Sequence, residues 1–105
     1  MGKTMLLIFV ATTLLIAATA FGEDPAIADG KKVYTAQKCQ LCHSIAGVGN
    51  KKSPLDGVGK KLNAEDIKKW IVSPKEMKAD TKMKAYPSLP AKDLDSLIVY
   101  MASLK

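Results

Sequence analysis

The chain has 105 residues, which is room for one domain at most, and a formal net charge of +6. All 16 of its basic residues are lysines, a pattern that suits a hydrated surface or weak docking to acidic proteins and gives little reason for nucleic-acid binding. Because so small a domain buries little apolar surface, we expect a disulfide, metal or cofactor to reinforce it.

Residues 1–20 have the features of a secretory signal peptide. A positive start at Lys3 precedes an uncharged apolar run, which ends in the small-x-small sequence Ala18-Thr19-Ala20. At roughly 16 residues the run is shorter than the ~20 that span a bilayer, so we expect cleavage after Ala20 or Gly22 rather than a retained anchor. The mature domain, residues 21–105, is then periplasmic, and it would meet a membrane only if the signal were kept.

A first helix is predicted over residues 25–39, with Ile27 and Tyr34 as its apolar side chains. Gly30 lies one turn before Tyr34, although glycine inside a helix costs roughly 0.5–1 kcal/mol relative to alanine. We expect a close crossing by the carboxy-terminal helix to require this glycine.

The sequence Cys39-Gln40-Leu41-Cys42-His43 is the C-x-x-C-H pattern of covalent haem attachment. Two thiols at this spacing can each bond one vinyl group of haem, and the next side chain can then bring its imidazole to the iron. A thioredoxin-type centre would need a βαβ context, a zinc site would need a fourth ligand, and a disulfide across two residues would be strained. The pattern therefore predicts one covalently bound haem c.

A second helix is predicted over residues 64–72, with Asn63 as its N-cap and Pro74 ending it. Trp70 lies on its apolar face. It is first a candidate core aromatic, and it could also pack on haem or donate its indole N–H to a haem propionate.

The sixth iron ligand cannot be a second histidine, because His43 is the only one in the chain. Methionine, lysine, the amino terminus, water or a vacant position remain. Met77 and Met83 lie in a lysine-rich segment that we expect to be an irregular loop, where packing explains a thioether poorly. Met101 completes the apolar stripe of a final helix near residues 91–104 and is a core candidate.

No strand pattern is found, and glycines 47, 49, 57 and 59 mark loops between the helices. The predicted fold is all-α, with three or four helices wrapped around one covalently attached haem.

The chain resembles a class I cytochrome c from about residue 29 to residue 104. Gly30 and Tyr34 match the family's glycine and aromatic residue on the first helix, and Leu97 and Tyr100 match its closing helix. An additional methionine at Met77, and Trp70 at a position that varies in the family, are modest departures.

The resemblance also implies site residues. Pro54, eleven residues after His43, matches the proline whose carbonyl holds the ligand imidazole. Asp80–Met83 matches the ligand loop, with Met83 nine residues after Pro74. It therefore implies Met83, rather than Met77, as the second axial ligand opposite His43.

The expected function is that of a monomeric, soluble one-electron carrier between larger redox proteins with acidic docking surfaces, and not an enzyme. Lys75, Lys78, Lys82 and Lys84 flank the implied ligand and would face such partners. The alternatives are a gas-binding or sensing haem domain with a labile sixth ligand and, more remotely, a peroxidase, for which the chain has no distal histidine.

Overall fold

The computed structural model describes residue 2 and residues 22–105. The predicted export signal therefore lies outside the described residues, apart from Gly2. In the part of the chain that the structure describes, no helix is both long and apolar enough to cross a membrane.

Helix α1 (Pro25–Ala36) begins at a strong cap. The Asp24 carboxylate accepts a hydrogen bond from the Ala26 amide at 2.8 Å, and Pro25 occupies the first turn, where its missing N–H is not needed. The helix ends earlier than the predicted residue 39, because Lys38 adopts a left-handed conformation with φ of 58°. A 3₁₀ turn, η1 (Cys39–Leu41), follows in a new direction.

Helix α5 (Ala91–Ser103) crosses α1 at Gly30, as predicted. A Cβ atom at Gly30 would overlap the carbonyl oxygen of Ser96 and lie 2.6 Å from the Cβ of Tyr100. One turn further on, the rings of Tyr34 and Tyr100 pack edge to face, with 5.9 Å between their centroids. The glycine is required because the two backbones approach too closely for any side chain.

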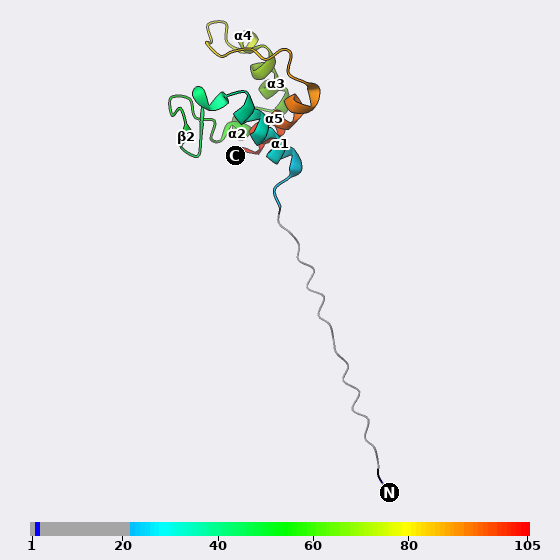
Figure 1. Cartoon of the computed structure of the whole chain (residues 1–105). Coiled ribbons are helices and arrows are strands. Elements are labelled where there is room, and N and C mark those ends of the chain that lie inside the picture. Colours follow the sequence, from blue (N-terminus) through cyan, green and yellow to red (C-terminus); the bar gives the residue numbers. More distant parts are fainter. Residues whose placement is uncertain (1, 3–21) are drawn as a thin grey trace.

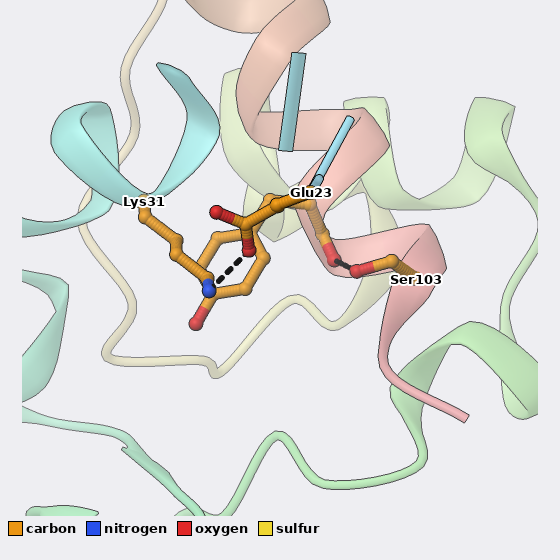
Figure 2. Close-up of polar contacts among 4 residues, drawn as sticks. Glu23, Lys31 and Ser103 are labelled. Carbon is orange, nitrogen blue, oxygen red and sulfur yellow. Dashed lines mark hydrogen bonds and ion pairs between the residues drawn. The ribbon is translucent and has the colours of Figure 1, made fainter. Parts of the chain in front are cut away.

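Two polar contacts lie near this crossing, one that joins Glu23 to α1 and one within the last turn of α5. Figure 2 shows the ion pair between Glu23 and Lys31, and the hydrogen bond that the Ser103 hydroxyl donates to the Tyr100 carbonyl at 2.5 Å. The Lys31 ammonium also lies 5.9 Å from the centroid of the Tyr100 ring. Since the ion pair is exposed to solvent, we expect it to contribute little stability.

Helix α3 (Ala64–Val72) has the predicted bounds. The Asn63 side chain accepts a hydrogen bond from the Asp66 amide at 2.8 Å, which caps its first turn. Two single-turn helices were not predicted: α2 (Val58–Lys61) and α4 (Pro74–Met77). Pro74 thus starts a helix as well as following one, and the expectation that Met77 lies in an irregular loop was wrong.

A short antiparallel hairpin corrects the expectation of a strand-free domain. Strands β1 (Ser44–Ile45) and β2 (Val48–Gly49) pair with Ser44 opposite Gly49. Ala46 and Gly47 form the two-residue turn, both with positive φ, and the Asp56 carboxylate accepts a hydrogen bond from the Ala46 amide at 2.8 Å. Strands of two residues are too short to leave an alternating pattern in the sequence.

The helices enclose a single apolar core. Helices α3 and α4 lie above the crossing of α1 and α5, and the β1–β2 hairpin projects to the left of it (Figure 1). The buried apolar side chains of the core cluster come from α1, α3 and α5: Tyr34, Ile67, Ile71, Leu94, Leu97, Ile98, Tyr100 and Met101. The architecture is therefore mostly helical, as predicted, with the hairpin as a minor addition.

Candidate cofactor-binding site

A cavity of about 530 Å³ opens beside the core, which is within the range of small-molecule and cofactor sites. Its walls come from the end of α1, from η1 and the residues after it, from α2, α3 and α5, and from the segment that joins α4 to α5. Most of the lining is apolar, with side chains that include Leu55, Val58, Leu62, Ile71, Leu97 and Met101.

The C-x-x-C-H motif lies in this wall, where η1 brings its members together. The amides of Cys42 and His43 both donate to the Cys39 carbonyl, at 3.1 and 3.0 Å, so the motif forms one tight turn. Both cysteines are free thiols that line the cavity, Cys39 half-buried and Cys42 exposed. Burial raises the pKa of the Cys39 thiol.

The His43 ring also lines the cavity, and its orientation is fixed by a backbone carbonyl. Its Nδ1 atom lies 3.1 Å from the carbonyl oxygen of Ser53. Because a carbonyl can only accept, Nδ1 carries the proton, and Nε2 keeps the lone pair that a metal would need.

The structure differs here from the prediction that the carbonyl of Pro54 holds the imidazole. Pro54 forms an isolated bridge with Ser44, with the Ser44 amide donating to Ser53 at 3.2 Å and the Leu55 amide donating to Ser44 at 2.8 Å. This pairing presents the preceding carbonyl, that of Ser53, to the ring. Pro54 itself is outside the cavity lining.

Of the two candidate methionine ligands, Met83 lines the cavity and Met77 does not. Met83 is half-buried in the irregular segment, where its amide donates to the Thr81 hydroxyl at 3.2 Å. Tyr86 anchors the same segment, since its amide donates to the Ile71 carbonyl at 2.9 Å. The structure thus brings His43 and Met83 to one cavity from positions forty residues apart.

Trp70 is half-buried, lines the cavity and lies outside the fully buried core. The structure therefore places it differently from the core position that was its first interpretation, because the side of α3 that carries it faces the cavity. Tyr34 and Tyr86, which sequence reasoning did not assign to the site, also line the cavity. The Ser53 carbonyl was missed too, and no sequence signal marks a backbone acceptor.

Exposed lysines surround the cavity. Lys38, Lys78, Lys82 and Lys84 contribute to its lining, whereas Lys75, which was expected in this group, does not. The Lys84 ammonium lies 5.5 Å from the centroid of the Tyr86 ring, which holds its charge near the cavity. We call Lys38, Lys78, Lys82 and Lys84 the lysine rim.

The residues present fit a covalently bound haem. The apolar cavity carries two free thiols that could attach haem, and the His43 imidazole and the Met83 thioether could each bind its iron.

Comparison with known proteins identifies the family of this chain. The family model described as "Cytochrome C oxidase, cbb3-type, subunit III" matches residues 25–101. The protein described as cytochrome c oxidase subunit 2 of Alkalihalophilus pseudofirmus is 31% identical over 85 residues, which cover 72% of this chain and 25% of that protein. The chain thus spans about a quarter of the length of this relative, and no solved structure matches it. The chain therefore belongs to the family described as "Cytochrome C oxidase, cbb3-type, subunit III". It is a small monohaem cytochrome c domain of electron transport.

Proposed function

We propose that this domain is an exported one-electron carrier with a single haem c, held through thioether bonds to Cys39 and Cys42 and ligated by His43 and Met83. The observation that carries the proposal is the convergence on one cavity of both thiols, the only histidine and the Met83 thioether. Haem, when bound there, supplies reversible one-electron Fe(II)/Fe(III) exchange.

The protein residues prepare the site for that exchange. The Ser53 carbonyl fixes the His43 tautomer through a hydrogen bond of 3.1 Å, so that Nε2 is the ligand nitrogen. The apolar walls exclude water and favour the less charged ferrous form, and a soft thioether from Met83 favours it as well. These features predict a stable six-coordinate centre with a raised reduction potential.

If His43 and Met83 both bound the haem iron, no iron position would remain for a substrate, which would distinguish a carrier from a gas-binding domain. A potentiometric titration followed by visible spectra tests this directly. We expect one reversible one-electron transition and low-spin spectra in both states. A high-spin spectrum would favour the gas-binding alternative and contradict the proposal.

Export is the second part of the proposal, and it rests on the signal-like sequence of residues 1–20 and on the two cysteines. Fractionation of cells that express the full chain tests it. We expect haem-stained protein in the exported fraction, shortened by about twenty residues. Full-length protein in the membrane fraction would show that the segment is retained as an anchor.

The partner we propose is a terminal oxidase with an acidic docking surface. The matching family model and the similar protein both carry oxidase descriptions, and the lysine rim supplies the complementary charge beside the cavity. Steering of this kind weakens with salt, because the Debye length falls from ~10 Å at 0.1 M to ~3 Å at 1 M.

Charge reversal at Lys82 and Lys84 tests the partner. We expect the double change to glutamate to slow electron transfer to the oxidase at low salt by about tenfold, with the reduction potential almost unchanged. Lys105→Glu, at the chain end and outside the cavity lining, is the matched control and should have a smaller effect. An electron-transfer rate that does not depend on salt concentration, or that falls equally in the control variant, would contradict the proposed docking.

A further inference from the structure

The hydroxyl of Tyr34 is a buried polar group of the cavity wall with no partner. Tyr34 is 8% exposed, and its oxygen has no hydrogen-bond partner among the described residues. Tyr86, which lines the same cavity, donates its hydroxyl to the Gln37 carbonyl at 3.4 Å. A buried hydroxyl without a partner loses its bonds to water and gains none, so such groups are rare and call for an explanation.

The neighbouring residue Cys39 has a free thiol, which would become a thioether when haem is attached. Lys38 adopts a left-handed conformation after α1, and its amide donates to the Thr35 carbonyl at 3.0 Å. The chain turns there, and Cys39 lines the same cavity as Tyr34. The Cys39 thiol is free and half-buried. Cys39 packs against the core cluster that contains Tyr34, and burial raises the pKa of the Tyr34 hydroxyl to about 12.

We propose that Tyr34 is a positioning residue whose hydroxyl donates a hydrogen bond to the Cys39 sulfur once that sulfur is linked to haem. The inference rests on the proposed function, because it requires the thioether at Cys39. Linkage to haem removes the S–H proton of Cys39 and fixes the direction of the sulfur lone pairs. The sulfur is then a weak acceptor in the same cavity wall as the Tyr34 hydroxyl, which has no acceptor of its own within the described part of the chain. A hydrogen bond at this sulfur withdraws electron density from the cofactor edge and stabilises the reduced state.

Tyr34→Phe tests the role of the hydroxyl, because it keeps the ring and its packing. We expect the equilibrium constant for reduction to fall by roughly three- to tenfold, tenfold being about 59 mV for one electron, with covalent haem and the low-spin spectrum retained. The matched control is Tyr100→Phe, since Tyr100 is the other ring of the same edge-to-face pair, is also 8% exposed and does not line the cavity. The control should leave the potential unchanged.

A second pair of variants locates the acceptor. In Cys39→Ala protein, where Cys42 alone holds haem, adding Tyr34→Phe should cause no further shift in potential. A persistent shift would place the acceptor elsewhere and overturn the inference, as would an unchanged potential in Tyr34→Phe or an equal shift in Tyr100→Phe. Wild-type protein without covalent haem would instead refute the proposed function, so the two failures are distinguishable.

Discussion

The wall of the cavity formed by residues 39–56 is held by closely spaced backbone hydrogen bonds, whereas the segment of residues 78–90 is fixed at only a few points. In the first region, His43 donates to Cys39 at 3.0 Å, and the amide of Asn50 donates to His43 at 3.0 Å. In the second, the Tyr86 amide at 2.9 Å from the Ile71 carbonyl is the main tie to a helix. We refer to these regions as the proximal wall and the distal segment.

This difference in hydrogen bonding gives the proximal wall and the distal segment different roles. The proximal wall holds the attachment residues and the His43 ligand in a set geometry, and much of its order comes from its own backbone. The distal segment is held by side-chain hydrogen bonds and by the adjacent helix end. We therefore expect local unfolding of this segment to require less free energy than local unfolding of the proximal wall. We therefore expect loss of the proximal wall to abolish the holoprotein, and changes in the distal segment to alter its ligation and potential.

The largest expected effect comes from removing both attachment thiols. Cys39→Ala with Cys42→Ala should eliminate covalent haem, and the remaining chain should be largely unfolded because a domain of this size loses its central apolar mass. Haem staining after denaturing electrophoresis and far-ultraviolet circular dichroism measure the two results. Covalent haem in the double variant would disprove attachment through this motif, and each single change should reduce the haem yield severely.

Gly49→Ala tests the tight packing of the proximal wall. Gly49 has a φ of 108°, and a Cβ atom there would strike the His43 carbonyl and lie 3.1 Å from the Gln40 carbonyl. We expect a loss of about 2–4 kcal/mol in the free energy of unfolding, from backbone strain and steric overlap together. Denaturant unfolding of the holoprotein measures it.

Gly47→Ala is the matched control for that change. Gly47 also has a positive φ, 78°, but among the described residues no atom beyond its own chain neighbours lies within 4 Å of the position of its Cβ. It should carry only the strain, about 1–2 kcal/mol. Equal losses at the two positions would show that the proximal wall is less tightly packed than we infer.

Met83→Ala tests the distal segment. Removal of the internal ligand should raise the apparent affinity of the ferrous protein for carbon monoxide by about tenfold or more and lower the potential. Met77→Ala, at the end of α4 and outside the cavity, should leave both quantities nearly unchanged. A high-spin form produced by Met77→Ala instead would mean that Met77 is the ligand.

The smallest expected effect is at the anchor of the distal segment. Tyr86→Phe removes a long hydrogen bond of 3.4 Å to the Gln37 carbonyl and keeps the ring. We expect a loss of about 0.5–1 kcal/mol in the free energy of unfolding. A larger carbon monoxide affinity in this variant than in wild type would show that the anchor restrains Met83, whereas a loss comparable to that of Gly49→Ala would contradict the contrast between the two regions.

Sequence reasoning succeeded where the signal is local. The α3 helix, with its Asn63 cap, and the final helix could be predicted because capping and apolar periodicity lie within a few residues of each other. The attachment motif is contiguous, and Gly30 stood out as a costly residue inside a helix. In each case the physical cause is contained in the segment itself.

What escaped prediction depends on residues far apart in the chain. The Ser53 carbonyl reaches His43 only because Ser44 pairs around Pro54, and the hairpin depends on the Asp56 contact to Ala46. The residues alone left Met77 and Met83 as equal candidates, and the resemblance to class I cytochromes c was needed to favour one. Trp70 was interpreted first as a core residue and lies at the cavity instead, because the core and the cavity both lie against α3.

The ferric spectrum of the purified holoprotein shows whether His43 and Met83 both bind the haem iron, as we propose. Methionine bound to ferric haem gives a weak absorption band near the red end of the visible range. We predict this band in the wild type and in Met77→Ala, and its loss in Met83→Ala. A wild-type ferric spectrum that is high-spin and lacks the band would contradict the account.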